Sequence, residues 1–259
     1  MTDSARLPPP EYCRGLFQVY RYASLPSTNS YLKKHHAKFP AGSVVWALEQ
    51  TAGRGRFERQ WLAEPGRDLC CSVLLPLRAV PVQGRRNIPQ MAALAVCRVL
   101  EAHGLRPGLK WPNDVIVEDR KICGILCETA QSGERCDMVL GLGLNVNSRR
   151  REDQAPGQPA ISLADATGAD CDLRELLIEL LDALGVCWDL FLARSFAGIF
   201  DQVRERLIGV GRRISLKLPD SAHAGVISGI APDGALLFDC EQCGPLVVYS
   251  GDISLRGEC

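Results

Sequence analysis

The order in which strand and helix patterns follow one another constrains the fold of this chain more than any other feature of its sequence. Alternating or short apolar runs, which are typical of strands, occur at 16–22, 44–48, 69–75, 114–117, 122–128 and 138–146. Helical apolar spacing occurs at 91–100 and most extensively at 173–191, after the last of these strands. Because most strands come first and the longest helix afterwards, we expect an α+β fold, a mixed β-sheet with helices packed on it, rather than a repeating βαβ fold.

A different pattern begins near residue 210. Short alternating runs joined by Gly, Pro and Asp turns occur at 213–218, 225–230, 235–238, 246–249 and 253–256. Closely spaced strands of this kind predict a small β-barrel. A length of 259 residues also suits about two domains. We therefore expect one domain over 1–209 and a second over 210–259.

The charge balance and the N-terminal sequence argue against nucleic acids and membranes as partners of the protein. Lys plus Arg and Asp plus Glu number 30 each, so the chain lacks the basic excess that favours non-specific binding to nucleic acids. The first twelve residues include Pro8, Pro9 and Pro10 and have no long apolar core, which indicates neither a signal peptide nor a membrane anchor. We expect a cytoplasmic protein with no membrane partner.

The 12 cysteines lie mainly in apolar stretches such as 69–73, where a free thiol behaves as a small buried hydrophobe. We expect them to be reduced. The one CxxC, Cys240 to Cys243, has no second CxxC or His pair that completes a four-ligand zinc site, so we expect no metal centre in the protein.

The segment 49–61, Glu-Gln-Thr-Ala-Gly-Arg-Gly-Arg-Phe-Glu-Arg-Gln-Trp, carries the clearest sign of a ligand site. Gly53 and Gly55 let the main chain approach a ligand closely, and the guanidinium groups of Arg54, Arg56 and Arg59 suit carboxylate or phosphate oxygens. The spacing is neither that of a P-loop nor that of a dinucleotide-binding GxGxxG turn. We infer an anionic ligand; the alternative is a solvated basic surface loop.

A second candidate segment surrounds Pro112. Asn113 and Asp114 bring an amide and a carboxylate to one turn, and 118–121 has the character of a tight polar hairpin turn. Such a hairpin places Lys121 over the same pocket as Asp114, where its charge can neutralise the oxygens of a transferring phosphate. An ordinary strand connection and a solvated lysine are the alternatives.

A third candidate is the apolar strand 138–146, in which two glycines, Gly141 and Gly143, remove side chains from one face. A flat ring could lie close to the backbone there, with Asn145 giving hydrogen bonds at its end. The alternative is a plain bulged core strand.

Together these segments resemble the bacterial biotin protein ligases, in the same order along 22–147. Each motif alone is weak evidence for the family, but their joint order is specific. The motifs are Ser27-Thr28-Asn29, Gln50, Gly53-Arg54-Gly55-Arg56, Trp61, Lys110-Trp111-Pro112-Asn113-Asp114, Lys121 with Gly124-Ile125-Leu126, and Gly141-Leu142-Gly143-Leu144-Asn145. The C-terminal module, which ends in Tyr249-Ser250-Gly251-Asp252-Ile253-Ser254-Leu255-Arg256, is similar to the SH3-like domain of those ligases.

The resemblance implies a class II synthetase-like catalytic domain and a two-step reaction. Biotin is activated by ATP, with Mg²⁺ on the phosphates, to biotinyl-5'-AMP, and is then transferred to a lysine of an acceptor such as the biotin carboxyl carrier protein of acetyl-CoA carboxylase. Expected biotin contacts are Ser27, Thr28, Asn29, Gln50, Gly53, Arg54, Gly55, Arg56, Lys121, Gly124 and Gly141. Expected contacts of ATP or the adenylate are Arg54, Arg56, Arg59, Trp61, Asn113, Lys121 and Asn145.

The resemblance also assigns catalytic roles. Lys121 and Arg56 are expected to screen the negative charge as the biotin carboxylate attacks the α-phosphate, and Asp114 to orient or deprotonate the acceptor amine. Closure of the loop 53–59 is expected to protect the adenylate from water. The hypothesis requires the arginine loop and Lys121 to open onto the same face of the molecule.

One departure and several alternatives remain. The family loop usually has glycine before its last arginine, where this chain has Glu58; an acid there is expected to weaken adenylate affinity or to pair with an arginine. About fifteen residues precede the first strand, too few for a DNA-binding helix-turn-helix module, so we expect no DNA partner. We expect a monomer or weak homodimer. A lipoate-type ligase and a non-catalytic biotin-binding sensor are the alternative functions.

Overall fold

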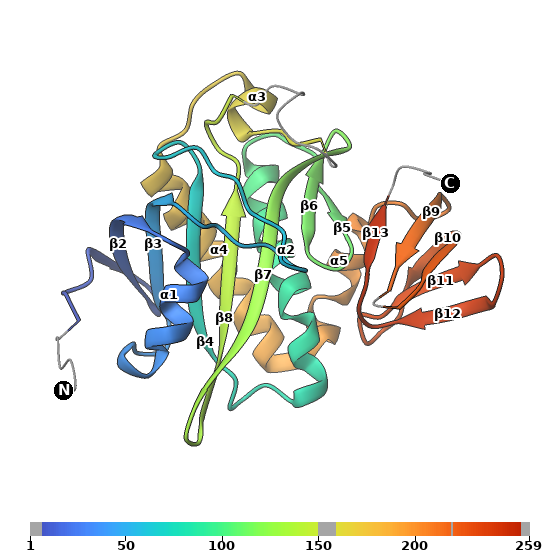
Figure 1. Ribbon diagram of the computed structural model, residues 1–259, viewed down its shortest axis with the longest axis horizontal. Coiled ribbons are helices and arrows are strands. Elements are labelled where there is room, and N and C mark those ends of the chain that lie inside the picture. Colours follow the sequence, from blue (N-terminus) through green and yellow to red (C-terminus); the bar gives the residue numbers. More distant parts are fainter. Residues whose placement is uncertain (1–6, 150–158, 219, 255–259) are drawn as a thin grey trace.

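The computed structural model describes residues 7–149, 159–218 and 220–254. An eight-stranded sheet has helices on both faces, and a five-stranded sheet lies at its side (Figure 1). The first sheet has the order β1-β2-β3-β4-β8-β7-β6-β5, in which β2 and β3 are parallel and the other neighbours antiparallel. The predicted α+β fold with a mixed sheet is therefore confirmed.

The strands of the first sheet are β1 (Tyr12–Arg14), β2 (Phe17–Leu25), β3 (Ser43–Gln50), β4 (Leu69–Pro76), β5 (Gly108–Lys110), β6 (Asp114–Val117), β7 (Arg120–Ser132) and β8 (Arg135–Leu144). The helices are α1 (Thr28–His35), α2 (Ile88–Ala102), α3 (Leu163–Thr167), α4 (Leu173–Arg194) and α5 (Phe200–Arg206), with short 3-10 helices η1 (His36–Lys38), η2 (Val82–Asn87) and η4 (Ser195–Gly198). The segment 149–159, which is rich in charged residues, Pro and Gly, lies almost wholly outside the described residues.

Burial on both faces explains why the central strands are almost continuously apolar. In β3, Val44 and Trp46 join the core under α2 and α4, whereas Val45 and Ala47 join a smaller core under α1. Successive side chains of a strand point to opposite faces, so a central strand covered on both sides has no polar face. Figure 1 shows α2 and α4 behind the sheet and α1 in front of it.

The helix ends follow the sequence signals. Ser27 caps α1 and accepts a hydrogen bond from the Ser30 amide. Asp172 caps α4 through the amides of Arg174 and Glu175. Gly104, with φ +81°, stands just beyond the end of α2, in the left-handed conformation that favours glycine at a helix terminus.

The hairpin of β6 and β7 differs from the prediction in one respect. Its turn consists of Glu118 and Asp119, with φ of 51° and 58°, and Lys121 lies within β7, paired with Ile116. Two successive positive φ values are typical of the two-residue turns that match strand twist, so the chain returns sooner than the four-residue turn predicted. Lys121 is therefore on a strand, and the strand fixes the direction of its side chain more firmly than a position in a turn would.

The second sheet has the order β12-β11-β10-β9-β13 and contains β9 (Arg213–Lys217), β10 (Ala222–Ile230), β11 (Leu236–Cys240), β12 (Gly244–Val248) and β13 (Asp252–Ser254). It packs on the main body through a shared apolar core and through hydrogen bonds from Asn87 to the Asp233 carbonyl and from Gln90 and Trp111 to the Gly234 carbonyl. These contacts hold β13 beside the first sheet. The boundary between 209 and 210 stays a prediction, and the predicted strand residues 255–256 lie outside the described part.

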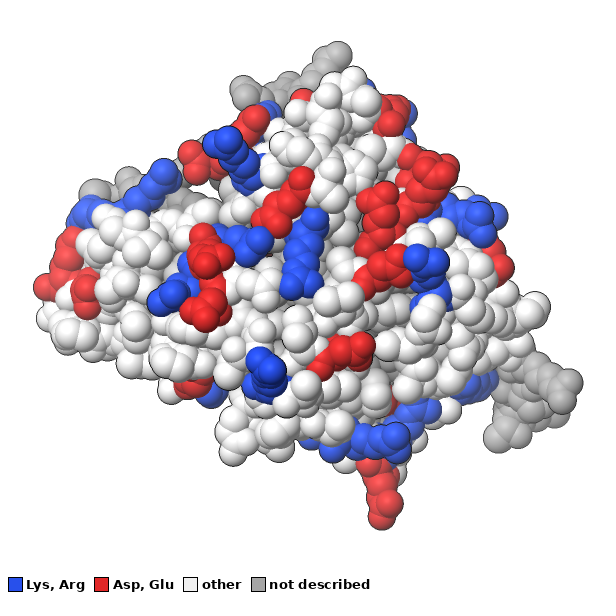
Figure 2. All heavy atoms as spheres, turned by 180° about the vertical axis from the view of Figure 1, so that it is seen from behind, with Lys and Arg blue, Asp and Glu red and all other residues white. Residues whose placement is uncertain are grey.

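Other surface features agree with the balanced composition. On the face that Figure 2 shows, acidic and basic side chains are intermixed rather than gathered by sign. Within the described residues, no helix is both long and apolar enough to cross a bilayer. The cysteines in this part of the chain are free thiols, and burial raises the pKa of several of them, for example Cys97 to about 12.

Candidate functional site

A cavity opens on the face of the first sheet that carries α1. It has a volume of about 760 Å³, including the part open to solvent, and it is lined by α1, the loop 51–61, the hairpin of β6 and β7, β8 and the start of β13. In Figure 1 the connection between β3 and β4 crosses in front of the sheet toward β7. Chain segments far apart in sequence thus surround one space.

The N-terminus of α1 and β3 form a buried polar end of the cavity. Thr28 donates two hydrogen bonds to Gln50 Oε1, from its amide at 2.8 Å and from its hydroxyl at 3.2 Å. Ser72 Oγ lies 2.7 Å from Thr28 Oγ1 and 2.6 Å from Asn29 Oδ1. Ser27, Thr28 and Asn29 are all buried, and such pre-ordered donors and acceptors suit a polar ligand head.

Asn29 is held on three sides. Besides Ser72, its Nδ2 donates to the Leu126 carbonyl at 3.2 Å and to Glu128 Oε2 at 3.1 Å. A Cβ at Gly141 would stand 2.2 Å from Asn29 Oδ1, closer than atoms can approach. The side chain of Asn29 therefore uses the space that the missing Gly141 side chain leaves.

Gly124 of β7 and Gly143 of β8 form a floor without side chains of its own, but a side chain from elsewhere in the protein lies on it. The indole of Trp61 stands where Cβ atoms of Gly124 and Gly143 would be, at 2.8 and 2.4 Å. Trp61 Nε1 is buried and has no hydrogen-bond partner among the residues that the structure describes. Because the loop 51–61 folds back over β7 and β8, a ring of the chain itself lies where the sequence predicts space for a flat ring.

The three arginines of this loop extend to three different elements. Arg54 contacts Glu128 of β7 at 3.3 Å, Arg56 donates to Asn113 Oδ1 at 2.9 Å, and Arg59 pairs with Asp252 of β13 at 2.6 Å. Burial lowers the pKa of Arg56, and the charges of Asp252 and Asp114 oppose that shift. The loop is therefore fastened across the cavity, and its last anchor comes from the second sheet.

Lys121 and Asp114 form the charged centre of the cavity. Lys121 Nζ lies 2.7 Å from Asp114 Oδ1 and 5.6 Å from the centre of the Trp61 ring. Nearby, burial lowers the pKa of Lys110, while the carboxylates of Asp114 and Asp252 raise it. Positive charge from β5, β7 and the arginine loop is thus concentrated around two carboxylates.

Asn145 helps to position the backbone of Lys121 through hydrogen bonds. Its Nδ2 donates to the Lys121 carbonyl at 3.2 Å and to the Ile161 carbonyl at 3.1 Å, while the Lys121 amide donates to the Pro159 carbonyl at 2.8 Å. Asn145 is 1% exposed and does not line the cavity. Its hydrogen bonds support the strand that carries Lys121, and its predicted contact with the nucleotide stays a prediction.

Glu58 adopts the backbone conformation that a glycine prefers. Phe57 and Glu58 have φ of 52° and 58° at the tip of the loop, and both are exposed. A non-glycine residue in this region carries strain of roughly 1 kcal/mol or more. Arg59, the neighbour of Glu58 in sequence, pairs with Asp252.

The structure brings together most of the predicted site residues. Those that line the cavity are Ser27, Thr28, Asn29, Gln50, Arg54, Gly55, Arg56, Arg59, Trp61, Asn113, Asp114, Lys121, Gly124 and Gly141. The requirement that the arginine loop and Lys121 face the same space is met. Gly53 stays at the base of the loop, where a Cβ would stand 2.4 Å from the Trp61 carbonyl oxygen, so its role is to allow the loop to close.

Sequence reasoning missed three contributors. Ser72 is fully buried behind α1 in an apolar run, and Asp252 reaches the cavity from the second sheet. Phe57 lines the entrance, and its ring packs against the Arg56 guanidinium at 4.8 Å. A hydroxyl residue inside a buried strand is a usable signal for Ser72 because such a group needs a polar partner; no local signal identifies Asp252.

Comparison with known proteins gives a consistent result. Residues 22–145 match the model of the Biotin/lipoate A/B protein ligase family. The chain is 31% identical to the biotin--[acetyl-CoA-carboxylase] ligase of Mycobacterium tuberculosis, with 98% of each chain covered. It is 33% identical to the bifunctional ligase/repressor BirA of Escherichia coli over 90% of this chain and 72% of that protein.

Solved structures extend the comparison to three dimensions. The biotin protein ligase from Aquifex aeolicus in complex with biotin and ATP superposes with a TM-score of 0.80 at 28% identity, covering 92% of this chain and 98% of that one. The likeness thus includes both sheets. Nearly complete coverage of a relative at 31% identity, together with this structural likeness, places the chain in the biotin protein ligase family.

Proposed function

We propose that the chain is an ATP-dependent biotin protein ligase that forms biotinyl-5'-AMP and transfers biotin to a lysine of an acceptor protein. One observation carries the proposal: the arginine loop and Lys121 line a single cavity whose other end is a buried polar cluster on α1. A carboxylate and a triphosphate must approach each other in the first step, and the cavity supplies positive charge at the place where they meet.

Biotin lies with its ureido head toward Ser27, Thr28, Asn29 and Gln50. The fixed donors and acceptors of this cluster match a head that both donates and accepts hydrogen bonds. The apolar body follows Leu126 and Leu142, which line the cavity between the cluster and Lys121. Its carboxylate then points toward the cationic end.

In the first step, an oxygen of the biotin carboxylate attacks the α-phosphorus of ATP. A new P–O bond forms, the bond to the bridging oxygen of the β-phosphate breaks, and pyrophosphate leaves. Lys121 and Arg56 screen the charge of the two anions. Trp61 Nε1–H, which lacks an acceptor within the described part of the chain, is available to an oxygen of the adenylate.

In the second step, the acceptor amine attacks the acyl carbon of the adenylate, the C–O bond to AMP breaks, and the amine loses a proton. Asp114 pairs with Lys121 before the nucleotide binds. When Lys121 turns to phosphate oxygens, the Asp114 carboxylate is freed to accept an N–H of the incoming amine. Lys121 thus acts in the first step and Asp114 in the second.

Mg²⁺ enters with ATP as part of the substrate. The two carboxylates that line the cavity, Asp114 and Asp252, are paired with Lys121 and Arg59, so the phosphates are the main ligands of the ion. The acceptor is the biotin carboxyl carrier protein of acetyl-CoA carboxylase or a similar domain. A cytoplasmic location and a monomeric or weakly dimeric state belong to the same proposal.

The proposal is tested by incubating the protein with biotin, MgATP and an acceptor domain, followed by intact-mass spectrometry. A ligase adds one biotinyl group to the acceptor and only when ATP is present. Lipoate in place of biotin gives no product if the specificity is correct. Biotin binding without acceptor modification would instead identify a sensor and refute the proposed activity.

Ligand binding is expected to order the loop 53–59. Its backbone is held by a few hydrogen bonds, such as Gly55 amide to Arg59 carbonyl at 2.7 Å, and the side chains of Arg54 and Arg59 are 49% and 62% exposed, against 14% and 23% for their partners Glu128 and Asp252. Ion pairs with one solvent-exposed partner contribute about 1 kcal/mol or less, so we expect the fastened loop to open transiently when no ligand is bound. Hydrogen exchange in 53–59 should slow with biotin plus MgATP, whereas exchange in the hairpin 132–135 serves as an unchanged reference.

Removing the charge of Glu58 is expected to tighten nucleotide binding. Glu58 is exposed and lies between Arg56 and Arg59, so Glu58→Gln reduces repulsion of phosphates through water. When the carboxylate and a phosphate are separated by about 10 Å or less, removing this screened repulsion is expected to lower the KM for MgATP by roughly two- to fivefold. The KM should fall at low ionic strength, and the gain should vanish in high salt. Glu134→Gln, on the opposite hairpin, provides a charge-matched control that leaves the KM unchanged.

A further inference from the structure

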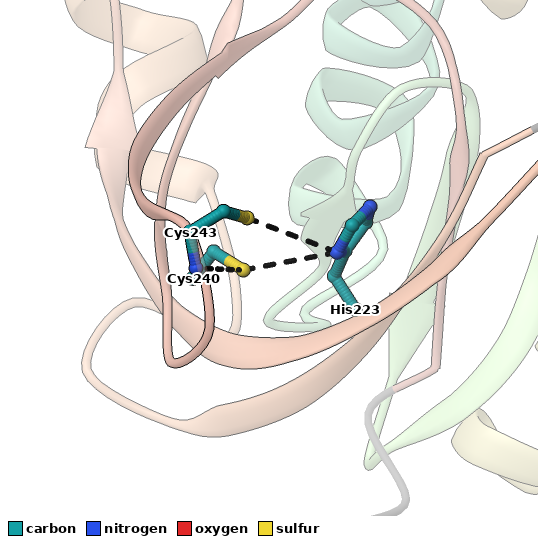
Figure 3. A group of neighbouring side chains, drawn as sticks. All are labelled: His223, Cys240 and Cys243. Atoms are coloured by element: carbon teal, nitrogen blue, oxygen red, sulfur yellow. Dashed lines mark hydrogen bonds between the residues drawn. The ribbon is translucent and has the colours of Figure 1, made fainter.

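A second group of reactive side chains lies in the five-stranded sheet, at its far end from the cavity. His223 of β10, Cys240 at the end of β11 and Cys243 in the turn before β12 bring their ligand atoms within 4.8 Å of one another (Figure 3). Cys240 is buried, His223 half-buried and Cys243 exposed. The sequence reveals the CxxC but not the histidine, which lies 17 residues before Cys240 and arrives through strand pairing.

The distances match those around one tetrahedral ion. His223 Nδ1 lies 3.7 Å from Cys240 Sγ and 3.9 Å from Cys243 Sγ. Zinc bonds of about 2.3 Å to sulfur and about 2.0 Å to nitrogen, at a tetrahedral angle, separate the two ligand atoms by roughly 3.5 Å. Shifts of a few tenths of an ångström therefore bring Nδ1 to the required distance from each sulfur, and all three ligand atoms already lie within 4.8 Å of one another.

Two further contacts prepare the ligands. Ser221 Oγ lies 2.9 Å from His223 Nε2, so an Nε2–H that donates to it leaves the lone pair on Nδ1, which faces the sulfurs. The Cys243 amide donates to Cys240 Sγ at 3.3 Å, a contact that stabilises negative charge on that sulfur. Figure 3 shows both thiols and Nδ1 directed at a common point.

We propose that His223, Cys240 and Cys243 form a binding site for Zn²⁺, with water as the fourth ligand on the exposed side of Cys243. Two thiolates and one imidazole are ligands that zinc favours over harder divalent cations. Binding replaces the two thiol protons, which are released to solvent. The ion joins β10 to the turn between β11 and β12 and so acts as a structural clip in this sheet, separate from the ligase chemistry.

The test uses the full chain, freed of metal under reducing conditions and titrated with Zn²⁺ in competition with a chromophoric chelator. We expect one equivalent bound per chain. Cys243→Ser and His223→Ala should each weaken binding by at least about a hundredfold, and Ser221→Ala by about tenfold because it acts only through the histidine. Cys13→Ser removes another exposed cysteine and should leave binding unchanged.

Two additional readouts separate the proposal from its competitors. Co²⁺ in place of Zn²⁺ should give thiolate-to-metal charge-transfer bands that disappear in Cys243→Ser, and Zn²⁺ should raise the melting temperature of the wild type but not of that variant. Equal binding in all variants would indicate an adventitious ion and overturn the site. A mass lower by two hydrogens together with no metal uptake by the reduced protein would identify a redox-active cysteine pair instead.

Discussion

Replacing Lys121 by alanine is expected to slow adenylate formation by about a hundredfold or more. The ammonium group of Lys121 lies 2.7 Å from the Asp114 carboxylate and also faces the Trp61 ring. Removal of a single preorganised group that stabilises charge in a transition state costs about 10²–10³ in rate. The loss should appear in kcat for biotin-dependent exchange of pyrophosphate into ATP, which reports the first step alone.

A control residue lies beside Lys121 on the same strand. Arg120 pairs with Glu118 at the turn and does not line the cavity, so Arg120→Ala should retain nearly full activity. Lys121→Arg keeps the positive charge but replaces a compact ammonium by a larger, delocalised guanidinium. This variant should therefore be faster than Lys121→Ala but slower than the wild type. If Lys121→Ala instead changed the transfer of preformed biotinyl-adenylate as strongly as pyrophosphate exchange, Lys121 would not be specific to the first step.

Local sequence patterns predicted the scaffold well because each depends on neighbours within a few residues. The apolar run of β3 reports a strand covered on both faces, and the Ser27 cap reports the start of α1. The hairpin turn was placed two residues too long, since Arg120 and Lys121 pair with Val117 and Ile116 and only Glu118 and Asp119 turn. That pairing follows from the register between the two strands, which the polar character of residues 118–121 does not reveal.

The parts of the site that the sequence did not reveal depend on long-range packing. Asp252 meets Arg59 only because the second sheet is held against α2 by Asn87 and Gln90. Gly141 and Gly143 predicted a face on which a flat ring can lie; the structure puts Asn29 against Gly141 and the Trp61 indole against Gly143, because a glycine specifies only empty space and not its occupant. Composition and spacing carry no information about which distant side chain arrives.

Adding a methyl group at Gly141 is expected to weaken biotin binding by about ten- to a hundredfold. A Cβ would stand 2.2 Å from Asn29 Oδ1, so the Asn29 side chain must turn away and lose hydrogen bonds to Ser72, Leu126 and Glu128. A buried polar group left unpaired costs about 1–3 kcal/mol, and each 1.4 kcal/mol corresponds to about tenfold in Kd. Calorimetric titration with biotin measures this effect without catalysis.

A double-variant cycle identifies the cause. Gly185→Ala, in α4, adds the same methyl group with its nearest neighbour at 3.6 Å and should leave biotin binding unchanged. Asn29→Ala by itself should weaken biotin binding comparably to Gly141→Ala, because both remove the amide from its place. Since Gly141→Ala acts through Asn29, the combined variant should lose no more than the larger single loss. Additive losses would instead mean that the glycine contacts biotin directly and that the displacement of Asn29 is not the cause.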